Sequence, residues 1–295
     1  MYYKATESNG QRRICYIQSS DGLTWTRPSL RTVTYNGSSS NIVSASGSPD
    51  NLFVFYDTNP NCPANQRYKG VYGQWGDGLY LQYSADGNKY FNGQTLIMGT
   101  PAQTGGCFYD TLNTIYWNNE LGKYVAFVRG VHQGDNYSLT PDYVAVSATK
   151  ITRDIRVAFS DDCIHWSTPV PLNYSSGGDY HMYANAIVPY FRAEQIYIGM
   201  PTRYMYPLNS STPGTDIFLM HSRDFVNWER TEEPYFTPDD GREAWDYGES
   251  GYPCVGYIQT SDKEMSIYMK ERNSSDTPVL YRYSLRLDGF RSAHG

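Results

Sequence analysis

The sequence predicts an all-β fold, a five-bladed β-propeller of antiparallel four-stranded blades, with residues 1–295 forming a single domain. Two observations support this prediction. The chain is rich in residues that favour strands, with 29 Tyr and 16% aromatic residues in total. One short turn motif also recurs along the chain, and each copy follows an alternating apolar segment that is typical of a strand.

The recurring motif has a Ser at the end of a strand, an Asp two residues later and an aromatic residue six residues later. Its copies begin at Ser19, Ser84, Ser160, Ser222 and Ser284. In the last copy the Asp has moved to Asp288. Because Ser and Asp side chains bond to the backbone of the turn that follows them, each copy is expected to close one strand of a repeated sheet unit.

The segments around these turns predict three strands in each unit, and a fourth outer strand would complete a propeller blade. The strands that lead into the turns are Ile14–Ser19, Leu79–Ser84, Ile155–Ser160, Ile217–Ser222 and Leu280–Ser284. The pairs that precede them are Leu52–Tyr56 with Tyr68–Tyr72, Asn113–Trp117 with Tyr124–Arg129, Ala186–Phe191 with Gln195–Met200, and Pro253–Ile258 with Glu264–Lys270. The first unit opens at Tyr2–Thr6 without an innermost strand, so we expect the first blade to be incomplete at the N-terminus.

Charge and composition exclude several classes of protein. The net charge of −6 argues against nucleic acid as a partner, because phosphate binding needs clustered Lys and Arg. No run of 18 apolar residues is present, so no membrane span is expected. The 5 Cys are dispersed without a Cys-x-x-Cys pair, which argues against a zinc site or a disulfide framework.

Cofactor and location follow from weaker signals. We expect no cofactor and no metal site; a structural calcium in the propeller channel is conceivable, but no acidic loop has calcium-ligand spacing. The N-terminus has no apolar signal segment, while several Asn-x-Ser triplets weakly favour secretion. We therefore expect an extracellular or periplasmic location, and the sequence leaves the oligomeric state open.

Propeller topology predicts where functional side chains lie. Residues just before each inner strand and just after each second strand should meet at one end of the central channel. The acids before inner strands are Asp110, Asp246 and Glu249, and His181 stands at the same place in another unit. The cations after second strands include Arg129, Arg203 and Arg272.

Glycoside cleavage needs two carboxylates, about 5 Å apart for retention and about 6.5–9.5 Å apart for inversion. Asp110 and Glu249 are the predicted catalytic pair, with Asp246 as a third catalytic candidate. Asp110 next to Arg129 should stay ionised and act as base or nucleophile. Glu249 in a site shielded by Tyr and Trp should act as the acid. The alternative is that these acids form solvated or structural ion pairs.

The remaining candidates would bind substrate. The cations could hold a carboxylate or sulfate on a sugar, or they could simply pair with the nearby acids. Asn113 and Asn185 occupy one repeat position, where the alternative role is to cap a tight turn. His181 could orient the substrate or be a structural histidine. Aromatic side chains near the channel could stack on sugar rings or pack in the core, and they are Tyr109, Tyr183, Trp245 and Tyr247.

These blocks resemble a known group of enzymes. The Ser-x-Asp-x-x-x-Trp turns and the segment Tyr109–Asn113 are similar to those of the five-bladed propeller glycoside hydrolases, namely the invertase/fructosidase and arabinanase/xylosidase families. The blocks His181–Asn185 and Pro201–Arg203 also look like an uncharacterised branch of that group. The invertase-type Asn-Asp-Pro-Asn, Arg-Asp-Pro and Glu-Cys blocks are absent. The resemblance implies catalysis by acidic residues in the central pocket.

The sequence thus favours a glycoside hydrolase that cleaves a poly- or oligosaccharide with a carboxylate acid/base pair. Two alternatives remain. The first is a propeller that binds carbohydrate without cleaving it. The second is a polysaccharide lyase that uses His181 and a Tyr on a uronate-containing glycan.

Overall fold

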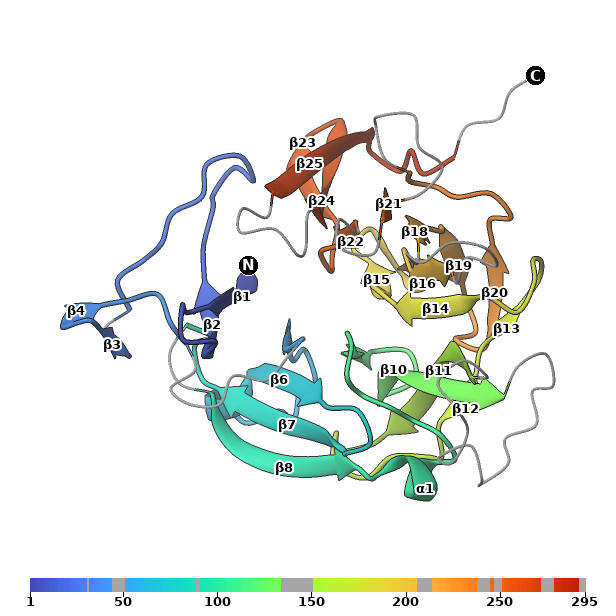
Figure 1. The fold of residues 1–295 in the computed structure, drawn as a ribbon, viewed down its shortest axis with the longest axis horizontal. Helices are drawn as coiled ribbons and strands as arrows, with labels where there is room; N and C mark the ends of the chain where they lie inside the picture. Colours follow the sequence, from blue (N-terminus) through green and yellow to red (C-terminus); the bar gives the residue numbers. More distant parts are fainter. Residues whose placement is uncertain are drawn as a thin grey trace. The chain divides into compact units, whose positions relative to one another are not determined.

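The structure is a computed structural model, and it describes residues 1–30, 32–43, 51–88, 91–133, 151–205, 214–237, 245–246, 251–271 and 279–291. Nearly all regular structure in these ranges is β-strand (Figure 1). The helices among them are the short turns η1 (Ala64–Gln66) and α1 (Pro101–Thr104). No helix in this part of the chain has the length and apolar composition needed to cross a membrane.

The chain divides into two compact units. The first comprises Met1–Ile151 and Ile155–Pro171, and the second comprises Thr152–Asp154 and Leu172–Gly295. Each unit is built from β-sheets whose strands are antiparallel except at one edge of the second unit, which confirms the predicted all-β class.

The first unit contains two small hairpin sheets and two four-stranded sheets. The hairpins are β1 (Tyr2–Thr6) with β2 (Arg12–Tyr16), and β3 (Thr34–Tyr35) with β4 (Ser38–Ser39). One larger sheet has the order β5 (Phe53–Tyr56), β6 (Tyr68–Gly73), β7 (Leu79–Ser84) and β8 (Asn92–Met98). The other has the order β9 (Thr114–Asn118), β10 (Lys123–Gln133), β11 (Ile151–Ser160) and β12 (Val170–Pro171). Both are the predicted meanders with a fourth outer strand.

The second unit contains three sheets. The first has the order β15 (Val188–Tyr190), β16 (Ala193–Gly199), β19 (Met220–Ser222) and β20 (Asn227–Arg230), and β13 (Asn173–Tyr174) runs parallel to β20 at its edge. The next has the order β14 (His181–Ala184), β17 (Thr202–Met205), β18 (Gly214–Ile217) and β21 (Trp245–Asp246). In the last, β24 (Glu264–Glu271) pairs with β22 (Tyr252–Pro253), β23 (Ile258–Ser261) and β25 (Val279–Arg286).

Two predicted strands are broken in the structure. The segment Pro253–Ile258 was expected to be continuous, but β22 ends at Pro253 and β23 begins at Ile258. Gly256 between them has a φ of 111°, a conformation that glycine adopts easily and that interrupts an extended strand. The segment Ile217–Ser222 is likewise divided between the end of β18 and the start of β19.

The Ser–Asp motif works as the sequence predicts in its four regular copies. In the copy at Ser160, the Ser Oγ accepts the backbone N–H of Cys163 at 2.9 Å. Oδ1 of Asp162 accepts the backbone N–H groups of Ile164 and His165, both at 2.8 Å. Comparable hydrogen bonds form at the other regular copies, with Ser Oγ accepting the N–H of the third residue after it. The motif thus satisfies the backbone donors of each turn, and at Ser84, Ser160 and Ser222 the Ser is the last residue of its strand.

The third residue after the Ser takes a left-handed conformation in all four copies. It is glycine at Gly22 and Gly87, where φ is 71° and 73°. It is Cys163 and Phe225 in the other two copies, where φ is 66° and 71°. A residue with a Cβ pays about 1–2 kcal/mol for this conformation. Cys163 is fully buried and the Phe225 ring packs 4.9 Å from that of Tyr197, so packing offsets the strain.

The degenerate fifth copy is built differently. Ser284 Oγ donates to the carboxylate of Glu264 on the neighbouring strand. Asp288 takes the left-handed conformation with a φ of 62°. Its carboxylate accepts a hydrogen bond from the Tyr190 hydroxyl and lies 3.3 Å from Nε of Arg192. The displaced Asp thus ties the end of β25 to the β15–β16 hairpin.

A buried ion pair joins strands within the first unit. The Lys69 ammonium on β6 lies 2.5 Å from the Asp57 carboxylate, and both side chains are almost completely buried. The Tyr124 hydroxyl on β10 donates to the same carboxylate at 2.8 Å. Burial opposes ionisation of Asp57, but the hydrogen bonds from Lys69, Asn59 and Tyr124 hold its pKa below the ordinary value. This network links the two four-stranded sheets of the unit.

The turn carboxylates make part of the stability depend on pH. Burial opposes ionisation of Asp162, but hydrogen bonds from His165, Ile164 and Ser160 together outweigh it and keep the pKa below the ordinary value. Asp162→Ala should therefore lower the free energy of unfolding by about 1 kcal/mol at neutral pH. Because the folded-state pKa is depressed, the deficit should shrink as the pH falls below about 3.9. Urea unfolding at several pH values measures both effects.

Asp161→Ala is the matched control for this prediction. Asp161 pairs with Lys123 at 2.5 Å, but both side chains are exposed to solvent. Exposed pairs of this kind contribute about 0–1 kcal/mol. Equal losses in the two variants, or a deficit for Asp162→Ala that does not change with pH, would contradict the role assigned to the turn.

Candidate functional site

Asp110 lies in the first unit, in the segment that connects α1 to β9. This segment runs beside the end of β10, where Phe108 N–H donates to Arg129 O and Val131 N–H donates to Gly106 O, both at 2.9 Å. The amide of Asn51 donates to the Asp110 backbone oxygen at 2.9 Å. The backbone that leads to Asp110 is therefore held by β10, and the Asp110 carbonyl is held by Asn51, which precedes β5.

The carboxylate of Asp110 pairs with a buried arginine. Its Oδ1 lies 3.1 Å from Nη1 of Arg129, whose side chain is only 1% exposed, whereas the Asp110 side chain is 27% exposed. The guanidinium favours the ionised carboxylate. The pair therefore holds a negative charge at the surface, backed by a cation that solvent does not reach.

An exposed tryptophan adjoins this pair. Trp75 lies in the turn between β6 and β7 and is 47% exposed. Its ring packs 4.2 Å from the ring of Phe108, and Cζ of Arg129 lies 5.5 Å from the Trp75 ring centroid. The prediction overlooked Trp75, although the residue follows a second strand, which is where functional residues were expected. An exposed ring of this kind can stack on the apolar face of a sugar.

Two candidates in this unit have structural surroundings. The Asn113 amide donates to Tyr109 O at 3.0 Å and to Thr111 O at 2.8 Å, and its Oδ1 accepts the Arg129 N–H at 3.0 Å. These bonds match the alternative role of capping the turn before β9. Tyr109 is fully buried, and its Cβ stands where a Cβ on Gly73 would be. Of the two roles that the sequence leaves open for Tyr109, the structure supports packing in the core, because solvent does not reach its ring.

The second unit brings several other candidates onto one sheet, formed by β14, β17, β18 and β21. His181 pairs with Tyr204, Tyr204 with Thr215, and Thr215 with Trp245. Asp246 pairs with Gly214 on the same sheet. The backbone positions of His181 and Trp245 thus share one rung, although they are far apart in the sequence.

His181 and Arg203 lie on opposite faces of this sheet. Arg203 precedes Tyr204 on β17, and successive strand residues point to opposite faces. Its Nε donates to Asp216 at 2.9 Å, and Nη2 donates to the other oxygen of the same carboxylate. Burial raises the pKa of Asp216, although Arg203 opposes this. The Arg203 guanidinium is thus bound to an acid, as in the alternative interpretation of the cations.

Arg153 is one of three β11 residues, Thr152–Asp154, that belong to the second unit, and it packs against the sheet face that carries His181. The Arg153 backbone N–H donates to His181 Nδ1 at 3.3 Å, and its Nη1 lies 3.3 Å from the same nitrogen. His181 Nδ1 is therefore an acceptor, and the ring proton of the neutral tautomer is on Nε2. Cζ of Arg153 lies 5.1 Å from the ring centroid of Tyr204 and 5.6 Å from that of Tyr183.

The structure describes the remaining candidate site residues to different extents. Tyr183 sits at an irregularity in β14, and its ring stacks 5.8 Å from that of Tyr204. Asn185 is buried, and its Oδ1 accepts the Ile187 N–H at 3.1 Å, which is again a turn-capping contact. Of Trp245 and Asp246, only the backbone is described. Glu249, Tyr247 and Arg272 lie outside the described residues.

One acid that the prediction overlooked is Asp50. It stands immediately before Asn51, whose amide contacts the Asp110 backbone, and it lies outside the described residues. The repeat could have revealed it, because it precedes the inner strand β5 as Asp110 precedes β9.

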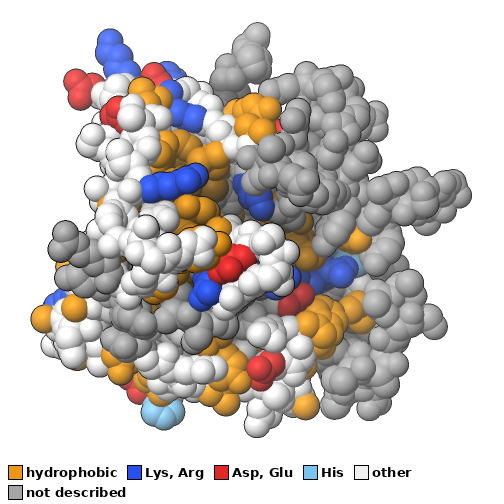
Figure 2. All heavy atoms as spheres, turned by 60° about the vertical axis from the view of Figure 1, so that its left-hand side comes forward, with side chains coloured by type: hydrophobic (Ala, Val, Ile, Leu, Met, Phe, Trp, Pro, Cys, Tyr) orange, Lys and Arg blue, Asp and Glu red, His pale blue; other side chains and the backbone are white. Residues whose placement is uncertain are grey.

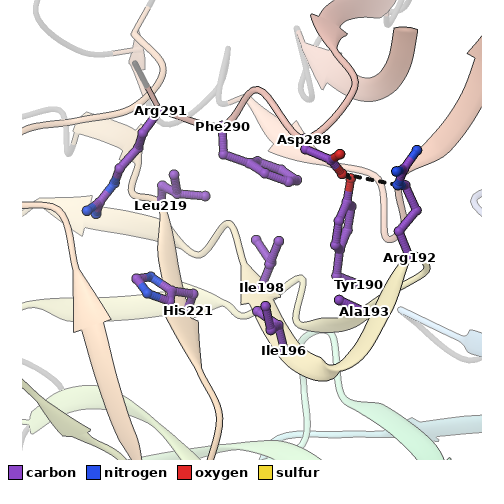
Figure 3. A pocket seen from close by; sticks show the side chains of 10 residues that line it. All are labelled: Tyr190, Arg192, Ala193, Ile196, Ile198, Leu219, His221, Asp288, Phe290 and Arg291. Atoms are coloured by element: carbon purple, nitrogen blue, oxygen red, sulfur yellow. Dashed lines mark hydrogen bonds and ion pairs between the residues drawn. The ribbon is translucent and has the colours of Figure 1, made fainter. Parts of the chain in front are cut away.

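A pocket of about 530 Å³ lies elsewhere in the second unit (Figure 3). It is formed by the β15–β16 hairpin, β19 and the chain after β25, and it is lined by Tyr190, Arg192, Ala193, Ile196, Ile198, Leu219, His221, Asp288, Phe290 and Arg291. Asp288 is its one carboxylate, and this group is bound to Tyr190 and Arg192. None of the predicted site residues that the structure describes lines the pocket, and its described lining holds one carboxylate, whereas glycoside cleavage needs two.

The surface charge and the potential metal ligands of the described residues do not indicate a further site. Figure 2 shows basic side chains scattered among hydrophobic and acidic ones on the face drawn. Within the described ranges, no group of three or more His, Cys, Asp or Glu side chains is arranged to hold a metal ion. All five cysteines are free thiols, and four of them are buried.

Comparison with solved structures identifies the fold. The chain resembles an endo-arabinase from Bacteroides thetaiotaomicron, with 10% identity over 97% of this chain and 93% of that chain and a TM-score of 0.57. It also resembles a glycosyl hydrolase from Bacteroides ovatus, with 14% identity over 96% and 79% and a TM-score of 0.50. A third similar structure is an N-acetylgalactosamine deacetylase from F. plautii in complex with blood group B trisaccharide, with 14% identity over 93% and 80% and a TM-score of 0.52.

No protein-family model matches the chain, and no curated protein is similar enough in sequence to count as a match. The likeness to these solved structures shows that the chain has a β-propeller fold, and it shows the fold alone. The number of blades stays a prediction.

The assignment of Asn113 as a turn cap can be tested. Asn113→Ala should lower the free energy of unfolding by about 3 kcal/mol, because it leaves the buried Arg129 N–H and two carbonyl groups without their partner. The exposed Asn173, which donates to Asn227 at 3.2 Å, is the control, and Asn173→Ala should change stability by less than about 0.5 kcal/mol. Chemical denaturation measures both. Unchanged stability with lost glycan binding would instead make Asn113 a substrate ligand.

Proposed function

We propose that the protein is a glycoside hydrolase that cleaves an O-glycosidic bond in a poly- or oligosaccharide. The observation that carries this proposal is the group formed by Asp110, Arg129 and Trp75 in the first unit. It combines a solvent-accessible carboxylate, a buried cation that keeps it ionised and an exposed aromatic ring. These are the parts that a site for a sugar ring and a developing positive charge requires.

In the proposed reaction, Asp110 acts as the base or the nucleophile. An ionised carboxylate can attack the anomeric carbon or remove a proton from water, and Arg129 preserves that ionised state. A second carboxyl group must protonate the leaving oxygen. Glu249 is the proposed acid, Asp246 is a further candidate, and Asp50 joins them because it adjoins Asn51. The fold shared with the endo-arabinase and the glycosyl hydrolase supports the proposal but does not identify the sugar.

Partners and location follow from this function. The partner is a carbohydrate substrate, and no cofactor takes part in the proposed acid–base chemistry. An enzyme that degrades polymeric glycans works where the polymer is, so we propose an extracellular or periplasmic location.

Substitution of the two carboxylates tests the mechanism. Asp110→Asn and Glu249→Gln should each lower kcat by at least about a hundredfold on natural glycans. Only Glu249→Gln should retain activity on a substrate with an activated leaving group, because such a group needs no protonation. Release of reducing sugar from a glycan panel measures activity, and Asp262→Asn at the exposed β23–β24 turn is the control.

Three outcomes would contradict this function. Glycan binding without any product indicates a carbohydrate-binding propeller. A product that absorbs in the near ultraviolet indicates a lyase, because elimination leaves an unsaturated sugar. Unchanged activity in both variants would remove Asp110 and Glu249 from the mechanism.

The stacking role of Trp75 gives a separate prediction. Trp75→Ala should lower kcat/KM about tenfold, equivalent to about 1.4 kcal/mol, through the loss of ring contacts with the sugar. The melting temperature should change little, because much of the side chain is already exposed. Tyr56→Ala is the control, since Tyr56 is a more exposed aromatic residue in the same unit. Equal effects of the two substitutions on kcat/KM would contradict the stacking role.

A further inference from the structure

Among the described residues, no acid pairs with the Arg153 guanidinium, and the other enclosed cations have an acid or several backbone carbonyl groups as partners. Arg129 pairs with Asp110, Arg203 with Asp216 and Lys69 with Asp57. Arg230 and Arg156 each donate to two backbone carbonyl oxygens: Ser176 and Gly178 for Arg230, Gly105 and Val131 for Arg156. Within the described residues, the hydrogen bonds of the Arg153 side chain are limited to the contact of Nη1 with His181, and its Nε–H is buried without an acceptor.

The surroundings hold this guanidinium in one place. Its Cζ lies 5.1 Å from the Tyr204 ring and 5.6 Å from the Tyr183 ring, and the two rings stack on each other at 5.8 Å. The Arg153 backbone N–H also binds His181, so both ends of the residue are fixed to β14 and β17. A cation that is fixed in advance loses little side-chain entropy when it binds an anion.

Leaving a buried guanidinium donor without an acceptor costs free energy. An arginine presents its Nε–H and Nη2–H as a fork that matches the two oxygens of a carboxylate. We propose that Arg153 binds the carboxylate of an acidic sugar, such as a uronic acid unit of the glycan. A sulfate ester offers the same oxyanion chemistry and is distinguished below. The inference deepens the proposed function, on which it rests, by naming the class of substrate.

The test measures binding rather than cleavage, on the full chain carrying Asp110→Asn so that no ligand is consumed. Calorimetry compares a uronate-containing oligosaccharide with the same oligosaccharide after reduction of its carboxyl groups. We expect the acidic form to bind at least about tenfold more tightly, and added salt to weaken that preference. Adding Arg153→Gln should abolish the preference, while Arg153→Lys should keep part of it.

Two controls sharpen the test. Arg192→Gln removes a partly exposed arginine at the β15–β16 hairpin and should leave the preference intact. A sulfated glycan and its desulfated form make the second ligand pair. Preference for the sulfated form that is lost with Arg153→Gln, without any preference for uronate, would assign the site to sulfate and overturn the carboxylate.

The outcomes separate this inference from the proposed function. An acidic preference that needs Arg153, with no cleavage by the unmodified protein, keeps the inference and rejects the hydrolase. Cleavage of neutral glycans with equal affinity for the acidic and reduced ligands keeps the hydrolase and rejects the inference. An acidic preference that survives Arg153→Gln also rejects the inference. If the Arg153→Gln variant fails to fold, the comparison of the two ligands on the chain that carries only Asp110→Asn can still reject it.

Discussion

Burying a cation without a counter-charge costs more free energy than most single contacts in a protein can return, and this constraint organises the functional regions of the chain. Lys69 is neutralised by Asp57, whose carboxylate also accepts a hydrogen bond from Tyr124, and this network joins two sheets of the first unit. Arg203 is neutralised by Asp216 inside the second unit. Both pairs occupy strands that also carry or adjoin candidate site residues, so charge pairing fixes the frame around them.

The same constraint gives Asp110 its character. The Arg129 side chain is almost completely buried, and the acid that pairs with it is Asp110, whose side chain is partly exposed to solvent. Its carboxylate is thus held in place and kept charged by a group that solvent cannot compete with. Arg153 illustrates the opposite case, since aromatic rings hold its cation and no acid in the described part of the chain pairs with it. A carboxylate held by a cation can act in catalysis, whereas a cation held by aromatic rings can bind an anionic ligand.

Much of the fold follows from local interactions, and these can be inferred from the sequence. The Ser–Asp turns form their hydrogen bonds within a few residues. The strand ends at Ser160 and Ser222 can therefore be predicted from the local sequence. Alternation of apolar residues identifies β6, β7 and β10 for the same reason. The break at Gly256 could not be inferred, because a glycine in an apolar segment is compatible with either a strand or an interruption.

The sequence by itself determined the all-β class, the repeated turn and the place of Asp110 before an inner strand, because each depends on neighbours within a few residues. Only the tertiary structure decided that Tyr109 is buried, that Asn113 closes a turn and that Arg203 binds Asp216 on the face opposite His181. It also brought Trp75 to Arg129 and Arg153 to His181. These outcomes depend on strand register and on which face of a sheet is covered, and both are set by contacts between residues far apart in the chain.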